Sequence, residues 1–110
     1  MSENFVISAE IRDGIPEIRV QPPLPDEYKI AVGSITFGSV KVGKYILANS
    51  IVDSTEEGED AHTLIKIDRR RFSTRHRMEL DYVRTAGRIK GVLQKHAEKN
   101  DLHDTFSFRD

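Results

Sequence analysis

Residues 63–82, TLIKIDRRRFSTRHRMELDY, decide the fold, because they fit a β-hairpin in one register. With a loop at 71–74, opposite charges meet on one face and apolar side chains meet on the other. Such cross-strand pairs stabilise antiparallel strands. The pairs in this register are Arg70–Arg75, Asp68–Arg77, Lys66–Glu79, Ile67–Met78, Ile65–Leu80 and Thr63–Tyr82. The stretch therefore predicts a hairpin whose tip is rich in arginine.

A second hairpin is predicted near the N-terminus, around a four-residue loop at 13–16 (DGIP). In this register Glu10 faces Arg19, and one face is apolar. A two-residue turn at Asp13-Gly14 would instead place Glu10 against Glu17, which like-charge repulsion disfavours. We therefore expect the longer loop. The apolar face would contain Ile7, Ala9, Ile11, Ile18 and Val20.

Two further segments are rich in β-branched and aromatic residues, as strands are. Residues 28–37 (YKIAVGSITF) are apolar on both faces after Lys29, which predicts a central strand. Residues 44–52 (KYILANSIV) predict another. In the tail, Phe106 and Phe108 alternate as in a short strand. The proline-rich segment 21–26 and the acidic segment 53–60 are expected to be loops.

The period of the apolar residues becomes helical between Thr85 and Lys99, and Asn100 is a suitable stop. The expected apolar face contains Tyr82, Ala86, Ile89, Leu93, His96 and Ala97. The opposite face carries Arg84, Arg88, Lys95 and Lys99, with Gly91 among them, within an arc of about 80° at 100° per residue. Residues 85–99 are thus predicted to form an amphipathic helix.

These elements predict a single α+β domain over residues 1–110. Five to seven antiparallel strands at about 4–83 would form a sheet or an open barrel, followed by one C-terminal helix at about 85–99 and a tail at 101–110. The order of elements resembles that of pleckstrin-homology-type barrels and of the coat subunits of RNA phages. The expected core is Ile7, Ile11, Ile18, Val20, Ile30, Val32, Ile65, Ile67, Leu80, Ile89 and Leu93.

Composition excludes several kinds of chemistry. The 110 residues contain no cysteine, so disulfides, thiolate metal sites and cysteine nucleophiles are excluded. The four histidines lack metal-ligand spacing with one another, and no catalytic or phosphate-binding glycine motif occurs. We therefore expect no enzymatic activity, no cofactor and no metal. The absence of a long apolar run or a signal peptide predicts a cytoplasmic protein without a membrane span.

Charge is distributed unevenly along the chain. Residues 1–60 contain five Lys and Arg against eleven Asp and Glu, a balance of −6, whereas residues 61–110 contain twelve against seven, a balance of +5. Such a difference indicates a polyanionic partner for the basic half, or pairing between the two halves. The pairing could occur within one chain or between copies.

The leading functional hypothesis is a nucleic-acid-binding module that forms a homo-oligomer. Guanidinium groups bind phosphates bidentately, and an aromatic ring among them can stack on a base of single-stranded nucleic acid, RNA included. The alternatives are a protein–protein adaptor or coat-like structural subunit whose basic tip binds an acidic protein surface, and a phospholipid-headgroup-binding barrel. The candidate binding residues are Arg69, Arg70, Arg71, Phe72, Arg75, Arg77, Arg84, Arg88, Lys95 and Lys99.

Overall fold

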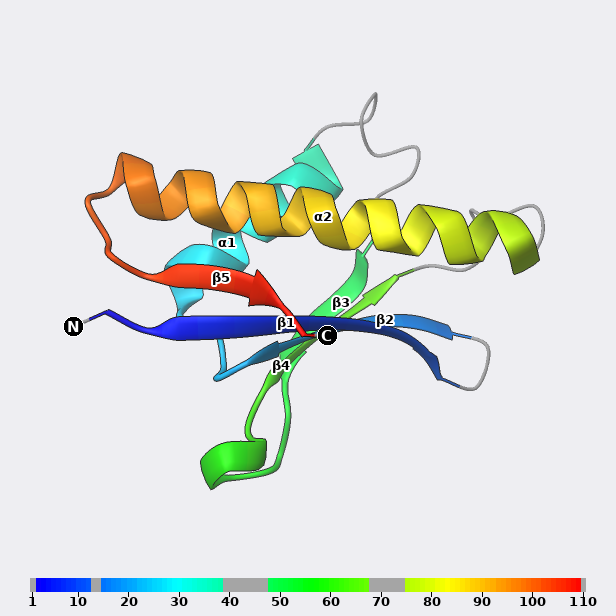
Figure 1. Cartoon of the computed structure of the whole chain (residues 1–110), viewed down its shortest axis with the longest axis horizontal. Helices are drawn as coiled ribbons and strands as arrows, with labels where there is room; N and C mark the ends of the chain where they lie inside the picture. Colours follow the sequence, from blue (N-terminus) through cyan, green and yellow to red (C-terminus); the bar gives the residue numbers. More distant parts are fainter. Residues whose placement is uncertain (1, 13–14, 39–47, 68–74, 110) are drawn as a thin grey trace.

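The structure, a computed structural model, describes residues 2–12, 15–38, 48–67 and 75–109. In chain order its elements are β1 (Asn4–Arg12), β2 (Ile15–Gln21), α1 (Asp26–Gly38), β3 (Ala48–Asp53), a 3₁₀ turn (Gly58–Asp60), β4 (Thr63–Ile67), α2 (Arg75–Lys99) and β5 (Thr105–Phe108). The five strands form an open sheet in the order β3-β4-β2-β1-β5. Both helices lie over the same face of this sheet, and α2 runs along the whole length of the molecule (Figure 1).

The predicted α+β class is confirmed, but the sheet is mixed. Strand β5 pairs with β1 in parallel, whereas the other pairs are antiparallel. The parallel pair places Phe106 beside Phe5, and their rings stack at a centroid distance of 5.2 Å. A second helix follows β2 and a strand follows α2, so the element order departs from the barrel and coat-subunit resemblances.

Residues 28–37 form most of α1, so the predicted central strand is wrong. Pro25 precedes the helix and its carbonyl accepts hydrogen bonds from the N–H groups of Tyr28 and Lys29. Asp26 and Glu27 in the first turn suit the positive end of the helix dipole. The helix buries Tyr28 and Val32, four residues apart, and leaves Ile30 71% exposed. An apolar run of this length fits a buried strand or a helix, and here tertiary packing selects the helix.

The arginine-rich hairpin predicted for residues 63–82 is also wrong. Its first arm is β4, but β4 pairs with β2 on one side and β3 on the other. Both edges of β4 are therefore occupied, and no edge remains for a partner strand at 75–80. Those residues form the first turns of α2 instead. The predicted tip residues 68–74 lie outside the described part of the chain.

The N-terminal hairpin is present, but in the register with the two-residue turn at 13–14, which we did not expect from the sequence. Arg12 pairs with Ile15, which leaves only residues 13 and 14 between the paired positions, and Glu10 faces Glu17. This register is displaced by two residues from the predicted one. Because side chains alternate with a period of two, such a displacement keeps the same residues on the same face. The predicted apolar face is therefore confirmed for Ile7, Ile18 and Val20.

The predicted C-terminal helix is confirmed, with its end at Lys99 and a start ten residues earlier than expected. After Asn100, Asp101 adopts a positive φ of 57°. The N–H of Leu102 donates to the carbonyl of Ala97 (2.8 Å) and that of Asp101 to Glu98 (3.4 Å), the pattern of a Schellman C-cap. The predicted strand at 44–52 is confirmed from Ala48 onward, and residues 44–47 lie outside the described part.

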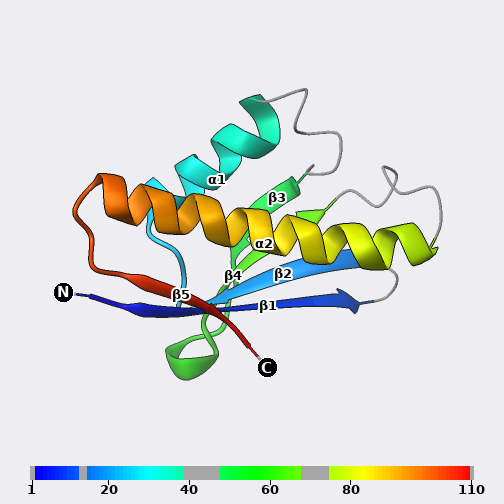
Figure 2. The same cartoon turned by 45° about the horizontal axis from the view of Figure 1, so that its top comes forward.

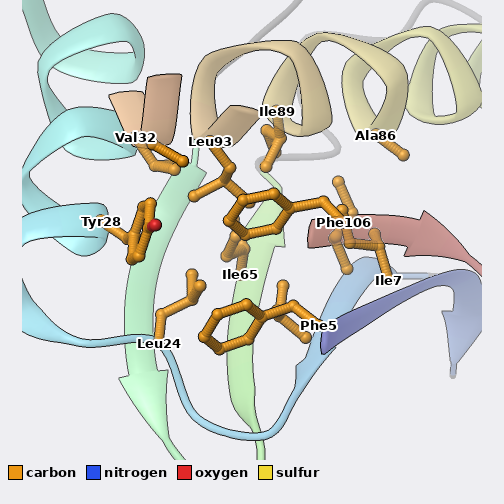
Figure 3. Packing of buried hydrophobic residues seen from close by; sticks show 13 residues of the cluster. Phe5, Ile7, Leu24, Tyr28, Val32, Ile65, Ala86, Ile89, Leu93 and Phe106 are labelled. Carbon is orange, nitrogen blue, oxygen red and sulfur yellow. The ribbon is translucent and has the colours of Figure 1, made fainter. Parts of the chain in front are cut away.

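The core lies between the sheet and the two helices (Figure 3). Seven of the expected core residues are buried: Ile7, Ile18, Val20, Val32, Ile65, Ile89 and Leu93. Ile30 is not, and the side chains of Ile11, Ile67 and Leu80 lie outside the described part. The core also contains Phe5, Leu24, Tyr28, Ala86, Ala97 and Phe106.

Candidate nucleic-acid interface

The basic face of α2 is fixed by the burial of the opposite face. Packing against the sheet buries the apolar residues of α2, namely Ala86, Ile89, Leu93 and Ala97. Helical geometry then turns the residues on the far side toward solvent. The four predicted cations Arg84, Arg88, Lys95 and Lys99 are all exposed. The structure therefore brings these four candidate residues into one row.

The row is long enough for several phosphate groups. At 1.5 Å per residue, Arg84 and Lys99 are about 22 Å apart along the helix axis, and each pair of cations four residues apart is separated by about 6 Å. The side chains of Arg88, Lys95 and Lys99 make no ion pair or hydrogen bond with any residue in the described ranges. Their charges are therefore available to an external anion.

The start of α2 adds positive potential to one end of this row. Arg75, His76 and Arg77 occupy the first turn, which contains no acidic residue. The N-terminus of a helix carries roughly half a positive charge, so cations there are unfavourable unless an anion compensates them. The side chains of Arg75 and Arg77 lie outside the described part, as do residues Arg69, Arg70, Arg71 and Phe72. Position 77 falls on the same helical face as Arg84, seven residues later.

Two of the histidines, His62 and His96, have structural surroundings, whereas His103 is exposed. His62 is buried, and its Nδ1 donates to the carbonyl of Asp60 (2.9 Å). His96, on the edge of the apolar face of α2, lies with Nε2 3.0 Å from Oε1 of Glu27. Within the described ranges, no three His, Asp or Glu side chains come together in a way that could hold a metal ion.

A polar cluster fastens α1 to the sheet. Lys29 Nζ donates to Asp53 Oδ2 (2.6 Å), and Thr63 Oγ1 donates to Asp53 Oδ1 (2.7 Å). The buried Thr63 hydroxyl also accepts a hydrogen bond from the N–H of Leu24 (2.8 Å). The hydrogen bond from Lys29 holds the pKa of Asp53 below its ordinary value, although desolvation opposes this effect. These hydrogen bonds join the polar groups of the cluster to one another, which indicates a structural role.

A pocket that the sequence analysis missed lies where α2 ends. It has a volume of about 430 Å³. Its apolar lining comes from Phe5, Leu102 and three prolines, and its charged lining groups are all acidic: Glu3, Glu27 and Asp104. A smaller hollow of about 390 Å³ shares Glu3 and Pro22 but also contains Arg109. Because the three acids are far apart in the sequence, no local pattern could have predicted the pocket.

Hydrogen bonds hold the acidic rim of this pocket in place. Asp104 accepts from the backbone N–H of Glu3 at Oδ1 (2.8 Å) and from the hydroxyl of Tyr28 at Oδ2 (2.6 Å). The pKa of the Tyr28 hydroxyl is raised, first by burial and then by its hydrogen bond to Asp104 and the charges of Asp104 and Glu27. The charged groups that line the pocket are thus the carboxyl groups of Glu3, Glu27 and Asp104.

Comparison of the chain with protein-family models, curated proteins and solved structures gives no match. In the described part of the chain, neither helix is long and apolar enough to cross a membrane.

Proposed function

We propose that the protein is a non-enzymatic module that binds single-stranded nucleic acid, RNA included, along the basic face of α2. The observation that carries the proposal is the row of exposed cations Arg84, Arg88, Lys95 and Lys99 on one face of α2. Phosphate contacts of this kind provide affinity without sequence specificity, through the release of counterions.

The arginine run that precedes the helix extends this proposal. Arg69, Arg70 and Arg71 lie just before α2 in the sequence, and Arg75 and Arg77 are in its first turn. Helix N-termini favour phosphate because their N–H groups and dipole both attract anions. Phe72 is the residue proposed to stack on a base.

The experiment measures the affinity of a fluorescein-labelled 20-nucleotide oligouridylate by anisotropy over a series of salt concentrations. Replacing Arg88, Lys95 and Lys99 by alanine should make the slope of log K against log salt shallower by about 2, at about 0.7 per phosphate contact on a single strand. Phe72→Ala should cost about 1–3 kcal/mol of binding free energy for single strands and little for duplex.

A matched pair of single variants controls for general loss of charge. Arg88→Ala and Arg109→Ala each remove one exposed arginine, and Arg109 lies after β5 beside the smaller hollow. Only Arg88→Ala should reduce the salt slope. Equal effects of the two variants, or an affinity that does not depend on salt, would reject the interface on α2.

The second candidate is a protein–protein adaptor or structural subunit. The observation that favours it is the acidic pocket at the end of α2, which has the composition of a docking site for a basic side chain. Such a function would use the pocket for a basic side chain of the partner and the arginines for an acidic surface of the partner.

A further inference from the structure

We propose that the protein forms a two-fold symmetric dimer through the face of the sheet that the helices leave uncovered. The inference goes beyond the proposed nucleic-acid function and does not depend on it, because the cations from Arg84 to Lys99 belong to a helix over the opposite face (Figure 1). In such a dimer the α2 helices of both copies lie on the outside.

Helices cover only one face of the sheet. Both α1 and α2 lie over the face that contains Ile18 and Ile65, and of the described elements only the 3₁₀ turn projects to the other side (Figures 1 and 2). Because side chains alternate along a strand, the uncovered face carries the residues between the core positions. Six of these residues carry the argument: Val6, Glu10, Glu17, Arg19, Leu64 and Lys66.

Arg19 lies on this face without an anionic partner. Its neighbours on the two adjacent strands are Ser8 and Leu64, neither of which is acidic. The side chain is half-buried, and its Nε is shielded from solvent with no hydrogen-bond partner in the described part of the chain. Burial of a guanidinium group without acceptors is costly. A carboxylate that approaches the uncovered face would pair with its terminal amino groups.

The other charges on this face favour a second copy over a polyanion as the source of that carboxylate. Among the described strand residues, the face carries two acids, Glu10 and Glu17, and two bases, Arg19 and Lys66. These four charges sum to zero, so a phosphate backbone would meet as many carboxylates as cations. A surface with the same mixture of signs is complementary to it.

One symmetry axis pairs these side chains. A two-fold axis that crosses β2 between Glu17 and Arg19, parallel to the sheet, places Glu17 of each copy opposite Arg19 of the other. In β4, Lys66 lies beside Glu17 and Leu64 beside Arg19. The same axis therefore places Lys66 opposite Leu64 of the other copy, where its aliphatic part can pack on an apolar side chain. The dimer thus contains two copies of each contact.

The 3₁₀ turn does not obstruct this arrangement. Gly58 and Glu59 line a hollow together with Gln21, so the turn borders the face at the end of β2. The axis described above reverses the direction of β2 between the two copies. The two turns therefore lie at opposite ends of the dimer and do not meet.

The area of the face suits a dimer that can dissociate. Strands of four to nine residues, spaced about 4.8 Å apart, form a sheet of about 24 Å by 20 Å, which gives about 500 Å² of face on each copy. Two such faces together bury about 1,000 Å², the lower limit for a specific interface. Val52, which is 46% exposed, and the half-buried Val6 and Leu64 provide its apolar part.

Sedimentation velocity of the purified, nuclease-treated protein over a series of concentrations measures the association. The average mass should rise with concentration from the 12.5 kDa of one chain to twice that value. It should rise no further, because a contact between two identical surfaces closes upon itself.

Charge reversal at two positions tests the axis. Arg19→Glu leaves acids at both positions, and Glu17→Arg leaves bases at both. Each variant alone should dimerise at least about tenfold more weakly than the parent, because like charges then face each other. An equimolar mixture should restore the dimer, since each contact then joins an acid and a base. A chain with both substitutions should also dimerise.

The matched control is Glu98→Arg, which makes the same change of charge at an exposed position of α2 and should dimerise as the parent does. Four outcomes would overturn the proposal: a monomer at all concentrations, a dimer that neither reversal weakens, equal weakening by the control, or a mixture that stays monomeric. A monomer whose affinity for oligouridylate falls on Arg19→Glu would assign this face to phosphate instead. Because the association is measured without nucleic acid, its failure leaves the proposed function as it stands.

Discussion

Glu10 of β1 lies directly opposite Glu17 of β2. Two carboxylates in this position repel each other, but Lys66 of β4 lies opposite Glu17 on its other side. On the core side of the sheet the same register pairs Ile7 with Val20, and both are fully buried. Burying one such side chain is worth about 1.5–3 kcal/mol, whereas a cross-strand charge pair is worth about 0.2–1 kcal/mol. Burial and a neighbouring cation therefore outweigh the repulsion.

Lys66→Gln should lower the free energy of unfolding by about 0.5 kcal/mol at low salt, because Glu17 then loses its compensating charge. The loss should shrink in 1 M salt, where the Debye length is about 3 Å. Urea unfolding at both salt concentrations measures this. Adding Glu17→Gln to the variant should recover part of the stability. A loss that is the same at both salt concentrations would show that Lys66 acts through packing and not through charge.

Leu93→Ala should destabilise the protein by about 2–5 kcal/mol, because Leu93 is fully buried between α2 and the sheet. Ile30→Ala is the matched control, since Ile30 is 71% exposed on α1. It should change the free energy of unfolding by less than about 0.5 kcal/mol. Thermal or urea unfolding of both variants makes the comparison. If the two losses were similar, the packing of α2 described here would be wrong.

The residues that share one face of a strand or helix could be predicted from the sequence more reliably than the residues that pair between strands. In β1 and β2 a displacement of two residues left the apolar face correct and the pairing wrong. In α2 the residues from Ala86 to Lys99 have an unambiguous helical period, and they were predicted correctly. Met78, Leu80 and Tyr82 alternate as in a strand, but Met78, Tyr82 and Ala86 also recur every four residues, as in a helix. Only the pairing of β4 with two other strands distinguishes these possibilities.

One of the two candidate surfaces, the row of cations on α2, could be predicted from the sequence, and the acidic pocket could not. The cations of α2 follow from the helical period, so their common face could be predicted. The acidic pocket is assembled from residues 3, 27 and 104. Its formation requires the parallel β1–β5 pair and the helix at 26–38, whose apolar run fits a strand as well as a helix. The parallel pair depends on contacts between the two ends of the chain.

Stability should fall in acid through Asp53. Its pKa is lowered in the folded state by the hydrogen bond from Lys29, while desolvation acts in the opposite direction. A lowered pKa means that this group stabilises the fold above its unfolded pKa of about 3.9, and that the contribution is lost as the pH falls through the lower folded value. Asp53→Asn should therefore reduce the loss of stability below about pH 4 in urea-unfolding curves.

Lys29→Met should have the same effect on the acid dependence as Asp53→Asn, because it removes the main cause of the shifted pKa. Glu57→Gln is the control, since it removes a carboxylate of the neighbouring acidic loop. A pH profile that Asp53→Asn leaves unchanged would exclude this cluster as a source of acid sensitivity.

Gly87 and Gly91 give α2 the spacing at which another backbone could approach closely. Both are exposed, and a Cβ atom at either position would meet no described atom within 4 Å. Glycine within a helix costs about 0.8–1.0 kcal/mol relative to alanine. Gly87→Ala and Gly91→Ala should therefore each stabilise the isolated chain by up to about 1 kcal/mol, measured by urea unfolding at low protein concentration.

Gly91 also lies among the cations between Arg88 and Lys95, so its variant should be measured for oligouridylate binding. Unchanged binding is expected if phosphates contact the long side chains, whereas a marked loss for Gly91→Ala alone would show that nucleic acid approaches the helix backbone itself.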